Sequence, residues 1–527
     1  MRIIITEKMG DEGVEILRQF CEVDYLHSIT REELLNVIGQ YDALVVRSVT
    51  QVNEEVISRG TKLKVVGRAG TGVDNIDVPV CSRYGVVVVN TPDSNTISTA
   101  EQCIALLLAT LRKVHAANAS VKSGVWDRTP FRGMELYGKT VGIVGLGRIG
   151  STVATRLRAF NMRVLAYDPY ITNERFERFG TEKVDSLDKI AELCDIISVH
   201  TPRTPETMYM LDETFFAKCK DGVRIVNAAR GGIIKESAIL AGIESGKIGS
   251  AGLDVFEKEP VDPNNPLFKL EKVVCAPHLG ADTNEAQKRV GEDIANQVIR
   301  VLKGELVPNV VNLPAILVDE LEILRPYVAL CERLGKIYYQ IRKAPVQKVE
   351  LQYNGPISKN EIEILNFSFL RGLLQPALGE SVNIVNAKYM AEERGIKFFV
   401  DKNEEKPKNY SNIVSVSITS EEGVLELSGA LSRHQQPLLI VINKVETEAE
   451  LEGFMLMVEN EDRPRMIGPV AMILGDANIN IATMKVVRKE RGTTAVMLLN
   501  VDDEVNDEIL AKLGSIEGIK NPKLLKF

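Results

Sequence analysis

Three residues with side chains suited to acid–base chemistry each follow an apolar run near the middle of the chain: Arg230, Glu259 and His278. An imidazole can take the proton from a hydroxyl group while a hydride leaves the same carbon. A carboxylate beside it fixes the tautomer of the imidazole, and an arginine binds a substrate carboxylate through two parallel hydrogen bonds. Because ligands of open α/β sheets bind beyond the carboxyl ends of the strands, these three side chains are predicted to converge there.

Residue type alone leaves alternatives to this set. Glu257 lies two residues before Glu259 and is equally acidic, and Asp254 is a further candidate. A single histidine is also more often a packing residue than a reactive one. His200 is predicted to end a strand, and the remaining histidines are predicted to be surface or packing residues: His27, His115 and His434.

A dinucleotide site is indicated by the stretch "VGIVGLGRIG", in which Gly145, Gly147 and Gly150 have the spacing G-x-G-x-x-G. The motif follows a predicted strand, opens a predicted helix, and precedes a second strand that ends at Asp168, 18 residues after the last glycine. The glycines let a pyrophosphate approach the helix N-terminus, and the carboxylate can accept hydrogen bonds from ribose hydroxyls. That carboxylate would repel a 2′-phosphate and no arginine directly follows it, so the predicted cofactor is NAD rather than NADP.

A second glycine-rich stretch, "GRAGTGVDN" at 67–75, also follows an apolar run. No helix with an acidic partner follows it at the spacing of a dinucleotide motif. It is either a simple turn or a loop that brings Arg68 and backbone N–H groups towards an anion.

Two sheets are needed to position these residues. Residues 1–95 and 140–275 both alternate short apolar runs with helical stretches. Continuous apolar runs are typical of parallel strands covered on both faces, so two doubly wound α/β lobes with a cleft between them are predicted. Within the first lobe the predicted strands are 2–6, 43–48, 64–70 and 86–90.

Long helices are predicted to join the two lobes at 95–119 and 282–304. Either Thr96 or Ser98 could be the N-cap of the first helix, and Glu101 stands at capping-box spacing from Ser98.

The sequence changes character after Pro308. Residues 307–320 are predicted to be a loop and 401–409 a charged, solvated loop, with less regular strands around them. Residues 453–527 have the order β-α-β-β-α-β, which predicts a small ferredoxin-like domain.

The composition excludes several classes of function. A net charge of −8 argues against a nucleic-acid or membrane-surface partner, which would favour a basic face. Seven scattered cysteines without a C-x-x-C pair predict neither a disulfide framework nor a zinc site, and they fit a reducing cytoplasm. The stretch "MRIIITEKMG" is predicted to be a strand rather than a signal peptide, and no apolar run is long enough for a membrane span.

Taken together, these motifs resemble the D-2-hydroxyacid dehydrogenase family, in its long form with two additional C-terminal domains. The resemblance covers residues 1–304 in order and is carried by "GRAGTGVDN", "NTPDSNTISTAE", "VGIVGLGRIG", "NAARGGI", "AGLDVFEKEP" and "APHLGADT". It implies that Arg230, Glu259 and His278 are catalytic, and it selects Glu259 over Glu257.

The resemblance also implies the ligands. The expected reaction is oxidation of 3-phospho-D-glycerate to 3-phosphohydroxypyruvate with NAD, the first step from glycolysis to L-serine. The implied substrate contacts are Arg47, Ser48 and Asn95. The implied cofactor contacts are Thr71, Gly145, Gly147, Arg148, Ile149, Gly150, Asp168, Thr201, Ala228, Ala229, Arg230, Asp254, His278, Leu279, Gly280 and Ala281. The candidates for the phosphate remain open among Arg47, Arg68, Arg128 and Arg132.

The family's architecture implies a Rossmann-type NAD-binding domain at 97–294, inserted in a flavodoxin-like substrate domain at 1–96 and 295–307. An α+β intervening domain at 308–452 would follow, in which some members bind anions. The implied last unit is an ACT regulatory domain at 453–527.

The ACT domain binds amino acids, usually at a paired interface, and L-serine is the effector that the resemblance implies. Asp462 would hold the amino group of the effector and Asn480 would hydrogen-bond to it, although Arg465 stands where the family has glycine. A cytoplasmic homo-oligomer, a tetramer, is expected. The alternatives are another D-2-hydroxyacid dehydrogenase, such as a glyoxylate or hydroxypyruvate reductase, and an NAD-sensing, corepressor-like binding protein.

Overall fold

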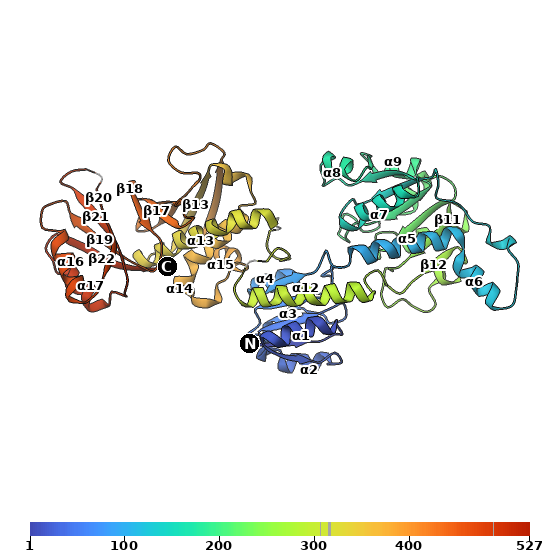
Figure 1. Cartoon of the computed structure of the whole chain (residues 1–527), viewed down its shortest axis with the longest axis horizontal. Coiled ribbons are helices and arrows are strands. Elements are labelled where there is room, and N and C mark those ends of the chain that lie inside the picture. Colours follow the sequence, from blue (N-terminus) through green and yellow to red (C-terminus); the bar gives the residue numbers. More distant parts are fainter. Residues whose placement is uncertain (306, 315–317, 489) are drawn as a thin grey trace.

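The computed structural model describes residues 1–305, 307–314, 318–488 and 490–527. Figure 1 shows two α/β lobes, in blue and in cyan to green, and two further units in yellow to orange and in red. The two lobes are built on parallel sheets and the two C-terminal units on mixed or antiparallel sheets. The predicted fold class is therefore confirmed.

The first lobe contains a five-stranded parallel sheet in the order β2-β1-β3-β4-β5, which is flavodoxin-like. All four predicted strands are present, and an additional edge strand, β2, is half exposed and less apolar. The strands are β1 (Arg2–Ile5), β2 (Glu22–Tyr25), β3 (Ala43–Val46), β4 (Val65–Arg68) and β5 (Val87–Asn90). The helices are α1 (Asp11–Phe20), α2 (Arg31–Val37), α3 (Glu54–Arg59) and α4 (Val78–Arg83).

The second lobe contains a seven-stranded parallel sheet in the order β12-β11-β10-β9-β6-β7-β8. The strand order reverses between β6 and β9, which is where Rossmann folds bind a dinucleotide. The strands are β6 (Thr140–Val144), β7 (Arg163–Tyr167), β8 (Glu182–Lys183), β9 (Ile196–Val199), β10 (Val223–Asn227), β11 (Ile248–Leu253) and β12 (Val273–Cys275). The helices are α7 (Arg148–Ala159), α8 (Asn173–Arg178), α9 (Leu187–Leu193), α10 (Glu213–Lys218) and α11 (Glu236–Glu244).

The first connecting helix is shorter than predicted. α5 (Thr96–Arg112) ends where Lys113 adopts a left-handed conformation with φ of 49°, and α6 (Val114–Lys122) continues in a new direction. The backbone N–H of Met134 bonds to the carbonyl oxygen of Leu111 at 3.1 Å, so a distant segment takes an acceptor that a longer helix would use. A single helix over 95–119 is therefore wrong.

The predicted N-cap of α5 is also wrong. Asn95 occupies the cap position, and no side chain caps the helix. The hydroxyl of Ser98 instead donates to the carbonyl oxygens of Asn95 and Gly280, so it ties the helix to the loop after β12.

The second connecting helix, α12 (Asn284–Leu302), packs along the first lobe, as Figure 1 shows. Its buried residues Val290, Ile294 and Val298 share a core with β1 and β3. The predicted boundary between 294 and 295 falls inside this helix. We place the boundary of the first lobe before α12.

The third unit surrounds a six-stranded sheet in the order β14-β13-β15-β16-β17-β18. Residues 315–317 of the predicted loop lie outside the described residues, and a helix already begins at Val318, so the loop prediction is wrong for 318–320. The helices are α13 (Val318–Ile341), α14 (Glu363–Leu378) and α15 (Ala387–Glu393). The strands are β13 (Val346–Asn354), β14 (Lys397–Asn403), β15 (Ile413–Ser420), β16 (Gly423–Leu431), β17 (Pro437–Ile442) and β18 (Val445–Glu450).

The last unit has the predicted β-α-β-β-α-β order, with its strands arranged β20-β21-β19-β22. This order is that of a ferredoxin-like sheet, and both helices cover one core. Its elements are β19 (Phe454–Glu461), α16 (Ile467–Asp476), β20 (Ile481–Arg488), β21 (Thr494–Val501), α17 (Asp507–Gly514) and β22 (Ile519–Lys526).

Candidate active site

A histidine–carboxylate pair lies beyond the ends of β11 and β12. His278 Nδ1 is 2.7 Å from Glu259 Oε2, and the other carboxylate oxygen accepts the N–H of Phe256 at 3.0 Å. Burial raises the pKa of the Glu259 carboxyl, but the bonds from His278 and Phe256 and the charge of Arg230 outweigh it and lower that pKa. An ionised carboxylate only accepts, so Nδ1 is the donor and Nε2 is available as an acid or base.

The geometry distinguishes the two neighbouring glutamates. Glu257 does not contact His278. Its carboxylate accepts the backbone N–H of Glu236 at 2.7 Å. Glu259 is therefore the glutamate placed to polarise the imidazole.

Asp254 supports the turn that carries the histidine. Its buried carboxylate accepts the N–H groups of Leu279 at 3.0 Å and Gly280 at 2.8 Å, and the side-chain amide of Gln102 at 3.0 Å. These bonds hold His278 at φ of 57°, a conformation that non-glycine residues rarely adopt. Asp254 thus contacts the protein through both oxygens, and Gln102, which sequence reasoning missed, completes its shell.

The glycine motif has the shape of a phosphate cradle at the N-terminus of α7. Gly145 has φ of 92°, and a Cβ at Gly150 would lie 2.1 Å from the carbonyl oxygen of Gly145. A Cβ at Gly147 would meet no atom within 4 Å, so open space adjoins the helix N-terminus. Asp168 accepts the N–H of Leu146 at 2.9 Å, which ties the ribose-binding candidate to the same loop. The site fits NAD.

A cavity of about 500 Å³ between the lobes brings many predicted residues together. Those lining it are Thr71, Asn95, Arg148, Ile149, Thr201, Ala228, Ala229, Arg230, His278 and Gly280. Ser48 lines a neighbouring cavity of about 800 Å³ with Asp254, Glu259 and His278, so the imidazole stands between the two. The predicted cofactor and substrate residues that line neither cavity are Gly145, Gly147, Gly150, Asp168, Leu279, Ala281, Arg47, Arg68, Arg128 and Arg132.

Two guanidinium groups lie on the second glycine-rich stretch. A Cβ at Gly70 would lie 1.5 Å from Arg68 Nη1, and a Cβ at Gly72 would lie 2.0 Å from Arg230 Nη2. Burial, together with the charges of Arg230 and Arg47, lowers the pKa of Arg68 to about 10. The missing side chains of this stretch make room for the guanidinium groups of Arg68 and Arg230, the second of which lines the cavity.

The loop that carries Arg47 is held by Glu7, which sequence reasoning missed. The carboxylate of Glu7 accepts four successive backbone N–H groups, those of residues 47–50, at 2.9 to 3.1 Å. Burial raises the pKa of Glu7, but the hydrogen bonds from Thr50 and its neighbours outweigh burial, so the pKa lies below its ordinary value. Glu7 follows β1 and the loop follows β3, the strands between which the order of this sheet reverses.

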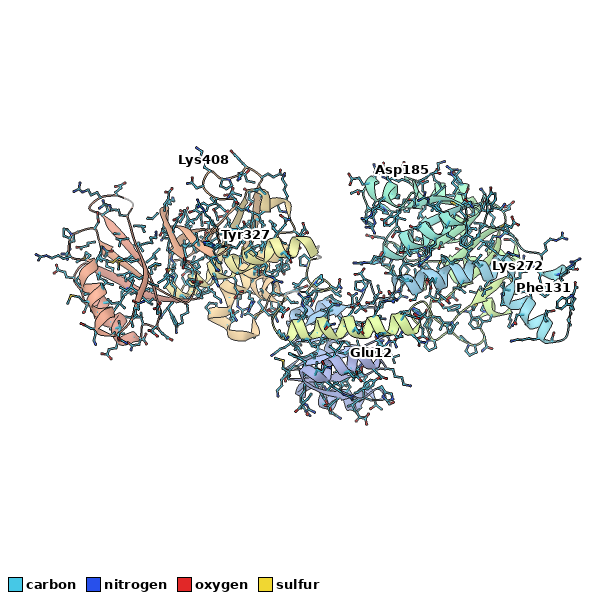
Figure 2. All side chains as sticks on the ribbon, in the orientation of Figure 1. Glu12, Phe131, Asp185, Lys272, Tyr327 and Lys408 are labelled. Atoms are coloured by element: carbon cyan, nitrogen blue, oxygen red, sulfur yellow. The ribbon has the colours of Figure 1, made fainter. Side chains whose placement is uncertain are left out.

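Arg128 and Arg132, the other two candidates for the phosphate, lie outside the cleft. They flank a short turn at Thr129–Phe131, and Figure 2 shows Phe131 at the outer end of the second lobe, away from Glu12 of the first. Arg132 lines a separate hollow with His115. The cleft of this chain therefore contains neither of these arginines.

His200 faces the cofactor side of the cavity as a neutral base. Its Nε2 is 2.8 Å from the hydroxyl oxygen of Ser198, and burial lowers its pKa to about 4. It follows β9, as predicted.

The pH dependence of stability is expected to report on His200. Its folded-state pKa lies below the ordinary value of 6.5, so the unfolded chain binds more protons between those values and stability falls as the pH falls. Wild type is expected to lose about 2 kcal/mol more than His200→Gln between about pH 7 and pH 5. Urea unfolding of both proteins at the two pH values measures this difference, and equal losses would contradict it.

The predicted effector residues do not meet within one chain. β19 and β20 both pair antiparallel with β21, so they run parallel to each other. Asp462 follows the end of β19 and Asn480 precedes the start of β20, which places them at opposite ends of the sheet. The carboxylate of Asp462 accepts two bonds from Arg488, at 2.8 and 3.0 Å, and Arg465 adopts φ of 71°, where a glycine would be unstrained.

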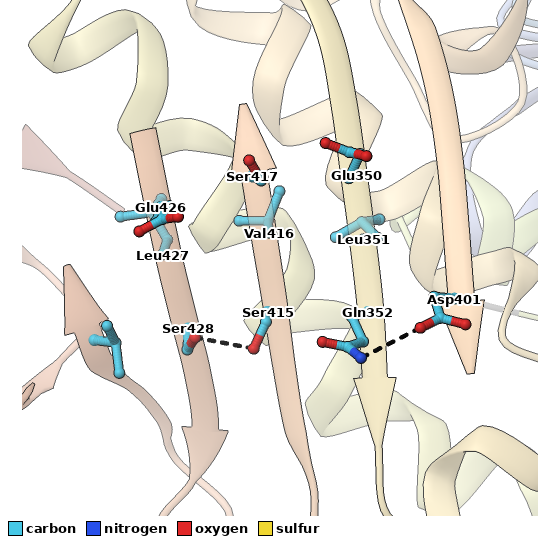
Figure 3. A pocket seen from close by; sticks show the side chains of 11 residues that line it. Glu350, Leu351, Gln352, Asp401, Ser415, Val416, Ser417, Glu426, Leu427 and Ser428 are labelled. Atoms are coloured by element: carbon cyan, nitrogen blue, oxygen red, sulfur yellow. Dashed lines mark hydrogen bonds between the residues drawn. The ribbon is translucent and has the colours of Figure 1, made fainter. Parts of the chain in front are cut away.

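A further hollow of about 430 Å³ lies on the open face of the third unit's sheet (Figure 3). Gln352 donates to Asp401 and the hydroxyl groups of Ser415 and Ser428 bond to each other. Glu350 and Glu426 also line it, and each forms an ion pair with a lysine, Lys348 at 2.7 Å and Lys444 at 3.8 Å.

Among the described residues, no group of three or more histidine, cysteine or acidic side chains could hold a metal ion. In the same part of the chain, no helix combines the length and apolar character needed to cross a membrane.

The fold and the cleft define an NAD-dependent dehydrogenase of the 2-hydroxyacid class. The model of the D-isomer specific 2-hydroxyacid dehydrogenase NAD-binding domain matches residues 104–280. A solved D-lactate dehydrogenase from Aquifex aeolicus, complexed with NAD and lactic acid, is 26% identical with a TM-score of 0.54 and covers 60% of this chain and 100% of its own.

The C-terminal units narrow the class. The D-3-phosphoglycerate dehydrogenase intervening domain matches residues 323–443, and the ACT domain matches 454–518. D-3-phosphoglycerate dehydrogenases from Methanocaldococcus jannaschii and Bacillus subtilis are 42% and 41% identical, over 100% and 99% of both chains respectively. This chain belongs to the D-3-phosphoglycerate dehydrogenase family.

Proposed function

We propose that this protein oxidises 3-phospho-D-glycerate to 3-phosphohydroxypyruvate with NAD, the first step of L-serine biosynthesis. The proposal is carried by one cleft in which a polarised histidine, a carboxylate-binding arginine and a dinucleotide cradle adjoin further arginines.

The proposal gives each residue a role. His278 Nε2 accepts the proton of the substrate's 2-hydroxyl group, and Glu259 stabilises the resulting imidazolium. Arg230 binds the C1 carboxylate, while Arg47 and Arg68 bind the phosphate. The glycine motif and Asp168 would hold NAD, which would supply the acceptor for the hydride of C2.

A substrate panel tests this function. Steady-state kcat/KM is measured with 3-phospho-D-glycerate, D-glycerate and D-lactate, and in the reverse direction with glyoxylate and hydroxypyruvate. The phosphorylated substrate is expected to be preferred by about 100-fold or more, because two charge-assisted contacts contribute several kcal/mol. Preference for glyoxylate would assign a reductase, and tight NAD binding without turnover would indicate a corepressor-like protein.

We also propose that the ACT domain binds L-serine at a site shared by two copies of the domain. Pairing is needed because Asp462 and Asn480 lie at opposite ends of one sheet, and Arg488 must release Asp462 for an effector's amino group. Serine added to the assay is expected to lower the rate. Unchanged rates at saturating serine would leave the domain a purely structural role.

We propose that the protein is a cytoplasmic homotetramer. All seven cysteines are free, which fits a reducing compartment. No residue of α6 is buried within the chain, and the following loop exposes 90% of Trp126. An exposed apolar surface of this kind is typical of a subunit interface.

Trp126→Glu is therefore expected to weaken assembly. A buried charge would cost several kcal/mol, so the mass measured by light scattering should fall from that of a tetramer towards a smaller species. Phe399→Glu, which changes an aromatic residue that is 52% exposed on the third unit, is the control. An unchanged mass for Trp126→Glu would place the interface elsewhere.

A further inference from the structure

We propose that Asp74, contributed by the first lobe, is a positioning residue for Arg230 of the second lobe. It holds the inner nitrogen of the guanidinium group so that the outer nitrogens face the cleft. This inference rests on the proposed function, because it assigns the orientation of the group that binds the substrate carboxylate.

Three contacts fix the guanidinium of Arg230. Nε lies 3.3 Å from Asp74 Oδ2, and Nη1 donates to the carbonyl oxygen of Ala229 at 2.8 Å. Gly72 lies beside Nη2, where an added Cβ would be 2.0 Å away, so the missing side chain leaves room for the group. Nη2 and the second hydrogen of Nη1 are left to bind a carboxylate as a pair.

The backbone of the turn that carries Asp74 is held in place. The turn of residues 73–77 is closed by Ile76 N–H donating to the carbonyl oxygen of Val73 at 2.9 Å. The buried side chain of Asn75 donates to the carbonyl oxygens of Arg47 at 3.0 Å and Thr50 at 2.7 Å. Asp74 therefore belongs to a turn that is attached to the loop carrying Arg47. Because the backbone of this turn is already ordered, little conformational entropy is lost when Asp74 contacts Arg230.

Charge supports the same role. Arg68 of the glycine-rich stretch and Arg230 are like charges, and the charge of Arg230 helps to lower the pKa of Arg68. Asp74 is close enough to both to counter that repulsion, and it lines the same cavity. Without this carboxylate, Arg230 would be free to turn away from Arg68 and from the substrate.

The contact joins the two lobes, since residue 74 belongs to the first sheet's loops and residue 230 follows β10. The orientation of the carboxylate-binding group thus depends on a residue across the cleft. Substrate binding and the approach of the lobes are thus coupled through this ion pair.

Asp74→Asn tests the proposal in the full-length protein. The variant keeps the shape of the side chain and removes its charge. It is expected to lower kcat/KM for 3-phospho-D-glycerate by about 10- to 100-fold, the cost of misplacing a binding group. Oxalate, a small dicarboxylate probe, is titrated into the enzyme–NADH complex by calorimetry, and its Kd should rise by a similar factor. The Kd of NADH should stay within about twofold, since Asp74 is not in the dinucleotide cradle.

Coupling to Arg230 separates positioning from a structural role. The Arg230→Lys variant lacks Nε and the planar group. In that background, Asp74→Asn should lower kcat/KM by less than about a further threefold. Asp74→Glu should recover part of the activity. Glu55→Gln, which breaks ion pairs with Arg31 and Arg59 on the surface of the same lobe, should leave activity unchanged.

Two results would overturn the proposal. One is a kcat/KM and an oxalate Kd for Asp74→Asn that stay within about twofold of wild type. The other is an effect of Asp74→Asn on kcat/KM that is as large in the Arg230→Lys background as in wild type. Asp74→Ser replaces Asp74→Asn if thermal melting shows that the latter does not fold. If wild type fails to oxidise phosphoglycerate, the proposed function fails, and the oxalate titration still decides the role of Asp74.

Discussion

His278→Asn is expected to lower kcat by about 10²- to 10⁴-fold, the usual contribution of a positioned general base. Asparagine suits this test because it tolerates the left-handed backbone that His278 adopts at φ of 57°, so the turn should persist. The variant keeps a polar side chain beside Glu259 but cannot take a proton. Stopped-flow and steady-state NADH formation measure the loss.

The control for this prediction is NADH binding. Fluorescence titration of His278→Asn should give a Kd close to that of wild type, because the cradle at Gly145, Gly147 and Gly150 is unchanged. Glu259→Gln should also lose activity, since it removes the carboxylate that fixes the tautomer of the imidazole and stabilises the imidazolium. Retention of a tenth or more of wild-type kcat by His278→Asn would show that another group takes the proton.

Arg68→Ala is expected to lower kcat/KM for 3-phospho-D-glycerate by about 10²- to 10³-fold, because a buried charge-assisted contact with the phosphate is lost. D-glycerate carries no phosphate, so its kcat/KM should change by less than about threefold. The ratio of the two values isolates the phosphate contact from general damage to the site.

Arg132→Ala is the matched control for the phosphate. Arg132 lies at the outer end of the second lobe and should leave the ratio unchanged. An equal loss in Arg132→Ala would show that a neighbouring subunit supplies the phosphate contact.

The parts of the fold that the sequence predicts well depend on burial. The apolar strands of both lobes and the order of the last domain follow from hydrophobic runs and their spacing. The break at Lys113 does not, because no glycine or proline marks it. It depends on a carbonyl oxygen of α5 being taken by Met134, 23 residues after Leu111.

The residues of the candidate site also divide into those that local sequence patterns reveal and those that they do not. The glycine motif and the histidine stretch are local patterns, so sequence reasoning finds them. Glu7, Asp74 and Gln102 act on residues 40 to 156 positions away, and nothing in their own neighbourhoods indicates this. Likewise, Glu257 and Glu259 cannot be separated by type, and only the turn after β11 decides which carboxylate reaches His278.

The most direct test of the proposed chemistry is a crystal structure of the protein with NADH and 3-phosphohydroxypyruvate. The carboxylate is expected at Arg230, the keto oxygen within hydrogen-bond reach of His278 Nε2, and the phosphate beside Arg47 and Arg68. A ligand that lies in this cleft with its phosphate on Arg230, or with its keto oxygen remote from His278, would contradict the roles given to these residues.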